Sequence, residues 1–176
     1  FTNFKKIDKD WEQDLKWFNR DKNWMIKDNL IIKWNNLLAL HSLKSNFAWK
    51  VKLIYIDPPY NTWNDSFKYN DRFNHSTWLT FMKNRLEVAK ELLSEEWFIF
   101  IQCDDYEQWY LKVLMDEIFW SDNFRNSIFW HRTYAGKTVS KNLPWNVDII
   151  HFFSKNNNVN INNVTTELTD KDIKSY

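Results

Sequence analysis

The stretch LIYIDPPY, residues 53–60, joins a short apolar run to a carboxylate and two prolines. Such an aliphatic run predicts a buried strand, and open α/β sheets bind their ligands at the carboxyl ends of their strands. The two prolines fix φ at about −65° and remove two backbone donors. We therefore expect Asp57 and the neighbouring carbonyls to form a rigid row of hydrogen-bond acceptors beside one aromatic face, Tyr60.

A row of acceptors beside an aromatic ring suits a flat ligand that carries an exocyclic amine. The acceptors can take the N–H groups while Tyr60 stacks on the ring, so a nucleobase is the expected ligand. The alternative is that residues 57–60 form only a connection between a strand and a turn.

This motif and its flanks resemble the amino-methylating DNA methyltransferases, which act on adenine N6 or cytosine N4. Residues 57–60 match the catalytic motif of that family, and the following NTWNDSFKYN, residues 61–70, makes the sequence most similar to the modification subunit of type III restriction–modification systems. The resemblance covers about residues 24–155, which makes it far more specific than a match of four residues.

The resemblance implies an α/β fold, namely the catalytic half of a Rossmann-like, S-adenosylmethionine-dependent methyltransferase sheet with about four strands and flanking helices. It divides the chain into a charged N-terminal extension (1–23), this catalytic half (24–154), and a polar linker or the start of a target-recognition segment (155–176). The sequence contains no Phe-x-Gly-x-Gly donor-binding loop. We therefore expect a fragment that lacks most of the donor pocket.

Hydrophobic periodicity predicts alternating helices and strands. Helices are expected over residues 36–47, 77–95 and 104–119, and strands over 51–56, 97–103, 127–131 and 147–153. The continuously apolar run 97–103 predicts a strand that is buried on both faces of a parallel sheet. Asp104 and Glu107 have the spacing of a helix capping box. A catalytic pair formed by Asp104 and Asp105 is the alternative.

Methyl transfer to an amine depends mainly on positioning and electrostatic stabilisation. The resemblance implies that the Asp57 carboxylate and the Pro58 carbonyl accept the amine N–H groups beside the methyl donor, and that Tyr60 stacks on the flipped base. With Pro59, these residues form the catalytic motif.

Further contacts with the base or the DNA are expected after the motif and around the aromatic and basic loop 132–141, although a solvated surface is the alternative for that loop. The candidates are Asn61, Thr62, Trp130, Tyr134, Lys137 and Lys141.

Composition adds few constraints. The formal net charge is +1, so there is no broad basic field for nucleic acid. The single Cys103 is expected to be a buried thiol, and with the four His it shows no metal-ligand spacing, so no metal is expected. No apolar run approaches the ~18 residues that span a bilayer, so a cytoplasmic location without membrane contact is the expectation.

The resemblance also implies a reaction and its partners. The expected reaction is adenine-N6 methylation of double-stranded DNA, with S-adenosylmethionine as donor. A second modification subunit and a restriction/helicase subunit are possible partners. The alternatives are a cytosine-N4 methyltransferase and a DNA-binding remnant without catalysis.

Tryptophan and glycine occur in unusual numbers. The chain holds 12 Trp and 1 Gly in 176 residues, where average usage of about 7% would supply roughly 12 Gly. Several tryptophans follow helix ends or lie in tight connections, where positive φ favours glycine. The family that the sequence resembles tends to carry glycine at these positions.

We therefore expect that the source reads UGA as glycine and that the sequence was translated with UGA as tryptophan. Trp78, on an apolar helix face, and Trp130, in a strand, are expected to be true tryptophans. The alternative is an aromatic-rich surface that stacks on bases. The suspected positions are Trp34, Trp49, Trp63, Trp97 and Trp120.

Overall fold

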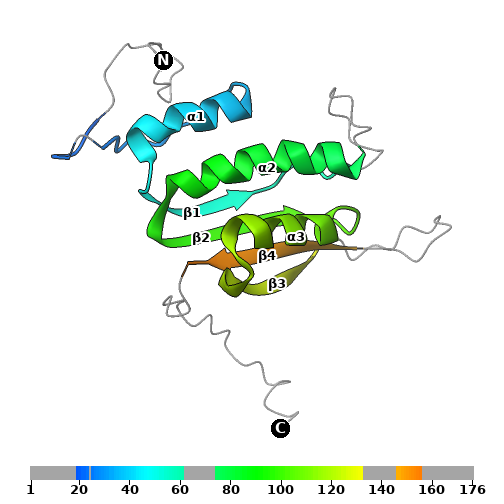
Figure 1. Ribbon diagram of the computed structural model, residues 1–176. Coiled ribbons are helices and arrows are strands. Elements are labelled where there is room, and N and C mark those ends of the chain that lie inside the picture. The colour runs from blue at the N-terminus through cyan, green and yellow to red at the C-terminus, as the bar shows by residue number, and fades with distance from the viewer. Residues whose placement is uncertain (1–18, 24, 62–73, 133–145, 156–176) are drawn as a thin grey trace, which may run out of the picture.

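The computed structural model describes residues 19–23, 25–61, 74–132 and 146–155. Helices and strands alternate along most of this chain, as Figure 1 shows. The helices are α1 (Asn36–Phe47), α2 (His75–Leu92) and α3 (Gln108–Phe119), with a 3₁₀ turn η1 (Ser121–Asn123). The strands are β1 (Val51–Ile56), β2 (Leu93–Cys103), β3 (Phe124–His131) and β4 (Val147–Ser154). The expected α/β architecture with four strands is confirmed.

The four strands form one mixed sheet in the order β1-β2-β4-β3. Strand β1 pairs in parallel with β2, whereas β4 is antiparallel to both β2 and β3. Strand β4 begins at the edge where β1 and β2 end, because Cys103, the last residue of β2, pairs with Ile149 near the start of β4. Residues 57, 104 and 148 therefore lie near one edge of the sheet.

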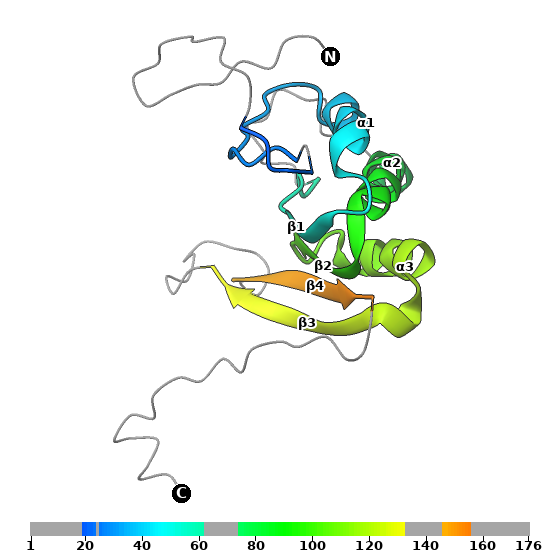
Figure 2. The same cartoon turned by 90° about the vertical axis from the view of Figure 1, so that its left-hand side faces the viewer.

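The helices cover one face of this sheet, as Figure 2 shows. Burial alternates along β2: Trp97, Ile99 and Ile101 are buried in the core, whereas Phe98 and Phe100 are partly exposed. Strand β2 is thus not buried on both faces within the described residues, contrary to the expectation from its apolar run. The core is completed by apolar residues of α2 and α3, chiefly Trp78, Met82, Leu86, Leu111, Met115 and Phe119.

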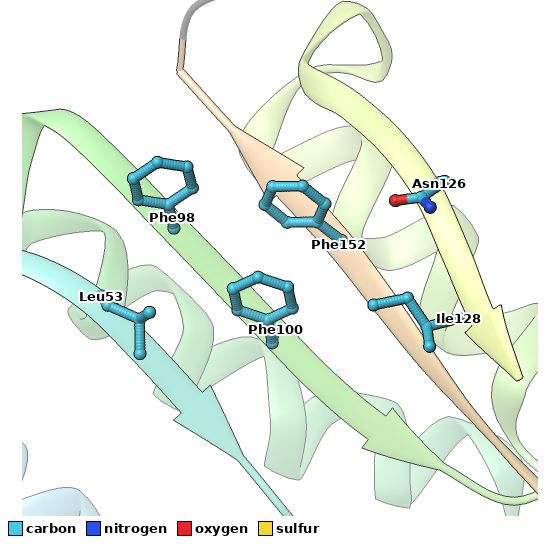
Figure 3. A pocket seen from close by; sticks show the side chains of 6 residues that line it. All are labelled: Leu53, Phe98, Phe100, Asn126, Ile128 and Phe152. Atoms are coloured by element: carbon cyan, nitrogen blue, oxygen red, sulfur yellow. The ribbon is translucent and has the colours of Figure 1, made fainter. Parts of the chain in front are cut away.

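The face of the sheet without helices carries an apolar hollow of about 350 Å³ (Figure 3). The rings of Phe100 and Phe152 stack across β2 and β4 with centroids 4.4 Å apart. The lining side chains come from all four strands: Leu53, Phe98, Phe100, Asn126, Ile128 and Phe152.

Helix α2 ends earlier than the sequence predicts, at Leu92, and β2 begins at the next residue. Trp97 consequently lies inside a strand and not after a helix. Its side chain is 5% exposed, and its ring packs against Phe119 with centroids 5.5 Å apart. The expectation that Trp97 occupies a helix C′ position with positive φ is therefore wrong.

Two of the other suspected tryptophans do have a backbone that suits glycine. Trp49 has φ 61° and Trp120 has φ 67°, and both are exposed. Trp120 also has ψ 134°, far from the left-handed helical region and near a region that almost only glycine adopts. Trp34 is not among the described residues with positive φ, and Trp63 lies outside the described residues.

Cys103 is a fully buried thiol, as expected. Burial raises its pKa far above the ordinary value, and the nearby Asp104 adds to the shift. Among the described residues, no helix combines the length and apolar character needed to cross a bilayer.

The backbone angles show at which positions the hypothesis that UGA encodes glycine is best tested. We expect UGA at the codons for Trp49 and Trp120, because their φ values favour glycine. We expect UGG for Trp78, which is 1% exposed in the core. The encoding DNA decides the matter, and UGG at both of the first two positions would refute the hypothesis.

Replacing Trp120 with glycine should stabilise the fold. Positive φ costs a bulky residue roughly 1–2 kcal/mol, whereas the contact of Lys90 Nζ with the Trp120 ring, 3.7 Å from its centroid, contributes about 0.5–1 kcal/mol at an exposed site. We expect Trp120→Gly to raise the free energy of unfolding slightly, as measured by urea denaturation of the complete protein. Trp97→Gly, which empties a core site, should lower it by about 3–5 kcal/mol. A loss of stability in Trp120→Gly would contradict this account.

Candidate active site

The motif forms the turn that follows β1 at the carboxyl edge of the sheet. Asp57 is exposed, Pro58 is buried, and Tyr60 is half-buried. Asn61, at the end of the turn, is 6% exposed and has φ 60°. The structure thus brings the sequence-predicted motif to the edge where α/β sheets bind ligands, with its carboxylate open to solvent.

The Tyr60 hydroxyl lies near Asp57. Burial raises the pKa of Tyr60 far above the ordinary value, and the neighbouring Asp57 raises it further. The phenol therefore stays neutral and can donate to the Asp57 carboxylate. A carboxylate offers about four lone-pair positions, so Asp57 keeps acceptor positions for another donor.

A second polar row lies next to the motif and was not predicted from the sequence. The Tyr55 hydroxyl donates to Gln102 Oε1 on β2, and Gln102 Nε2 donates to Asp148 Oδ2 at 2.9 Å. Arg132 Nε pairs with Asp148 Oδ1 at 3.2 Å. Asp148 is 2% exposed, and burial raises its pKa although Arg132 opposes the shift. Only the strand pairing reveals this row, because its members are distant in sequence.

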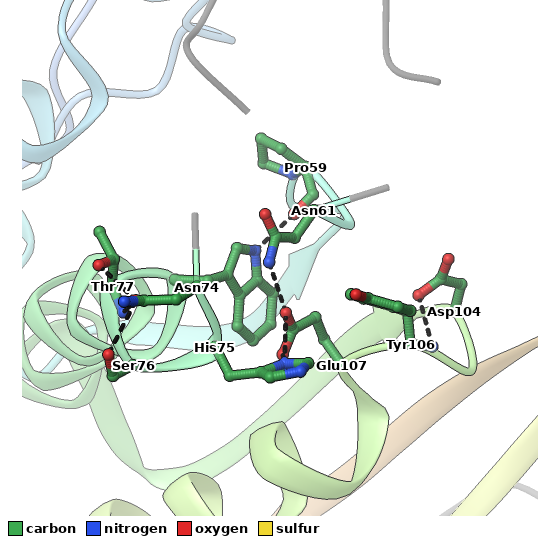
Figure 4. A network of polar contacts seen from close by, with 10 residues as sticks. Pro59, Asn61, Asn74, His75, Ser76, Thr77, Asp104, Tyr106 and Glu107 are labelled. Atoms are coloured by element: carbon green, nitrogen blue, oxygen red, sulfur yellow. Dashed lines mark hydrogen bonds and ion pairs between the residues drawn. The ribbon is translucent and has the colours of Figure 1, made fainter. Parts of the chain in front are cut away.

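The backbone of the motif is anchored by helix α2. The indole N–H of Trp78 donates to the Pro59 carbonyl at 2.7 Å, and Trp78 is 1% exposed (Figure 4). One of the expected carbonyl acceptors, that of Pro59, thus already has a side-chain donor. The bond ties the turn to the core.

Glu107 does not cap helix α3 with its side chain, contrary to the capping-box expectation. Its carboxylate is fully buried beneath the motif, where Oε1 accepts from Asn61 Nδ2 at 2.6 Å. His75 Nδ1 lies 3.0 Å from both Glu107 oxygens. Asp104 Oδ1 instead accepts from the Tyr106 backbone N–H at 3.0 Å, and burial raises the pKa of Asp104.

The structure describes two of the six candidates for contact with base or DNA. Asn61 points into the protein, toward Glu107. Trp130, on β3, is 58% exposed and pairs in register with Asp148, which places it next to the site. Their contacts with DNA stay predictions. The other four lie outside the described residues: Thr62, Tyr134, Lys137 and Lys141.

No group of three or more His, Cys, Asp or Glu within the described ranges is arranged to hold a metal ion.

Sequence comparisons identify relatives that match most of this chain. The profile of the DNA methylase family matches residues 51–176. The chain is 55% identical over 159 residues to the probable type III restriction-modification enzyme HindVI Mod subunit of Haemophilus influenzae, which covers 89% of this chain and 21% of that protein. It is 36% identical over 155 residues to the StyLTI Mod subunit of Salmonella typhimurium, covering 72% of this chain and 24% of that protein.

Structural comparisons agree on the fold. A candidate DNA modification methylase from Thermus thermophilus matches with a TM-score of 0.50 at 15% identity, over 72% of this chain and 53% of that one. The PvuII cytosine-N4-specific DNA methyltransferase also gives 0.50, at 12% identity, over 67% and 47%.

The chain spans only about a fifth to a quarter of the length of these two Mod subunits. The family profile nevertheless covers most of the chain, including the whole candidate site. This protein belongs to the N6/N4 DNA methylase family.

Proposed function

We propose that this chain forms the base-binding half of an S-adenosylmethionine-dependent DNA methyltransferase that methylates adenine N6. The observation that carries the proposal is the motif turn after β1, in which Asp57 is exposed at the carboxyl edge of the sheet and the backbone is anchored by Trp78. The aspartate at the first motif position favours adenine over cytosine.

The chemistry follows from the position of the acceptors. Adenine N6 is a poor nucleophile because its lone pair is delocalised into the ring. Asp57 accepts one N–H bond and the Pro58 carbonyl accepts the other, which stabilises the positive charge that develops on nitrogen. The Tyr60 ring stacks on the extruded base.

The site fits the implied methyl donor in charge. S-adenosylmethionine, when bound, supplies a methyl group on a cationic sulfonium. Asp57 places an exposed carboxylate at the edge where β1 and β2 end and β4 begins. An anionic group stabilises a nearby cation, so Asp57 suits the donor. Asp57 and Pro58 are the ones we assign to its methyl-bearing end.

The relatives suggest the wider setting. Two are named as Mod subunits of type III restriction-modification enzymes. We therefore propose that the complete protein modifies double-stranded DNA within such a system, with a second modification subunit and a restriction subunit as its partners. In this proposal, residues 24–154 form the catalytic half, 1–23 an extension, and 155–176 a linker toward target recognition.

Removing the Asp57 carboxylate should abolish most turnover without unfolding the protein. Loss of one preorganised electrostatic contact costs about 2.7–4 kcal/mol, so we expect Asp57→Ala to lower the rate by ~10²–10³. The assay is transfer of labelled methyl groups to unmethylated bacterial DNA by the complete protein. Asp122→Ala, which removes an exposed carboxylate in η1, is the matched control. Near-normal turnover in Asp57→Ala would refute the proposed function.

Changes at Tyr60 should separate the ring from the hydroxyl. Tyr60→Ala removes a stacking surface worth about 1–3 kcal/mol per base, so DNA binding and base capture should weaken. Tyr60→Phe keeps the ring and should have a milder effect, confined to turnover, because only the hydroxyl near Asp57 is lost. Fluorescence of 2-aminopurine at the target position reports base capture. Equal defects in the two variants would argue against stacking.

A further inference from the structure

A buried charge beneath the motif turn has no part in the chemistry just described. The side chain of Glu107 is fully buried, although it follows β2 at the start of helix α3. Burial of a carboxylate is strongly unfavourable unless hydrogen bonds or charges compensate it. Neither a side-chain cap nor a metal group within the described residues explains its presence.

The partners of Glu107 come from the end of the motif turn and from the start of helix α2, as Figure 4 shows. The Asn61 amide, directly after the motif, donates to Oε1 at 2.6 Å. His75, the first residue of α2, donates its Nδ1–H at 3.0 Å from each oxygen. Hydrogen bonds to an ionised acceptor are about twice as strong as neutral ones. The carboxylate therefore clamps the end of the motif turn to α2.

Glu107 binds Asn61, whose backbone conformation is uncommon. Asn61 has φ 60°, a conformation that asparagine tolerates better than most residues but that remains uncommon. The bond to Glu107 holds Asn61 there, while the Trp78 indole holds the Pro59 carbonyl at 2.7 Å. Tyr60 lies between these two anchored residues in the chain.

We propose that Glu107 is a positioning residue for methyl transfer: through Asn61 it fixes the motif turn in the conformation that presents Asp57 and Tyr60 to the base. Glu107 does not touch the base itself. This inference rests on the proposed function, since it concerns the same site.

Ring contacts of His75 support its interaction with Glu107. The His75 ring stacks on Tyr110 with centroids 4.4 Å apart and lies 5.4 Å from the Tyr106 ring. Both tyrosines belong to the segment that carries Glu107. The imidazole is thereby kept in place to donate to the carboxylate, and Glu107 is held between its two donors.

The first test uses Glu107→Gln in the complete protein. The amide keeps the shape but presents N–H groups to Asn61 or His75, so at least one bond is lost. A displacement of about 1 Å in a catalytic group costs on the order of 10²-fold in rate. We expect kcat to fall by about that factor while the Kd for S-adenosylmethionine changes less than roughly threefold. Glu117→Gln, on an exposed position of the same helix, should leave both values unchanged.

The second test is a double-mutant cycle with Asn61→Gly. Glycine adopts positive φ readily but cannot donate to Glu107. If Glu107 acts through Asn61, each single variant should lose a similar factor in kcat, and the double variant should lose no more than the worse single variant. A carboxylate that served stability alone would lower the melting temperature and leave kcat of the folded protein unchanged in each variant.

The outcomes separate the two proposals. No methyl transfer by the unaltered complete protein refutes the proposed function. Transfer by that protein with unchanged kcat in Glu107→Gln and Asn61→Gly overturns the positioning role, as do losses that multiply in the double variant. If Glu107→Gln fails to fold, Asn61→Gly alone still decides: an unchanged kcat overturns the role, and a fall of about 10²-fold supports it.

Discussion

Parallel pairing of β1 with β2 determines where the polar groups of this protein lie. Its register, with Ile56 opposite Ile101, places the residues that follow both strands at one sheet edge. Antiparallel β4 then begins at the same edge, because Cys103 pairs with Ile149. Carboxylates that are distant in sequence become neighbours there. A shift of this register by one residue would turn alternate side chains to the opposite face and would scatter the site.

The motif turn is held less by its own rigidity than by the layer of helices beneath it. Two prolines restrict φ, but Pro59 and Asn61 are held by the Trp78 indole and by the buried Glu107 carboxylate. Trp78 lies in α2 and Glu107 directly precedes α3, and both helices pack on one face of the sheet. The core therefore has two functions: it stabilises the fold, and it sets the direction in which the motif faces solvent.

The sequence predicts the elements well where periodicity is strong and the ends carry clear signals. Helix α1 and strand β1 begin and end where expected, since Asn35 caps α1 and Asp57 ends β1. The sequence predicts the end of α2 too late, because Leu93 continues the apolar stripe of the helix although it is the first residue of β2. It therefore predicts Trp97 after a helix instead of in the core.

The site was predicted only in part, for a related reason. Residues 57–60 form one short segment with a recognisable pattern, whereas Gln102, Asp148 and Glu107 acquire their roles through contacts across the sheet. No local signal marks such residues. The spacing of Asp104 and Glu107 even suggested a helix cap, because a capping box and a buried clamp can use the same residue types.

The bond between Asn61 and Glu107 links two positions that are 46 residues apart. An aliphatic residue at position 61 would leave the buried carboxylate with one donor fewer, and a neutral apolar residue at 107 would leave the amide without its acceptor. Either change alone is therefore harmful, whereas a paired change to a smaller apolar contact can be tolerated. Over evolutionary time the two positions should drift together, so that their identities are correlated among descendants of one ancestral gene.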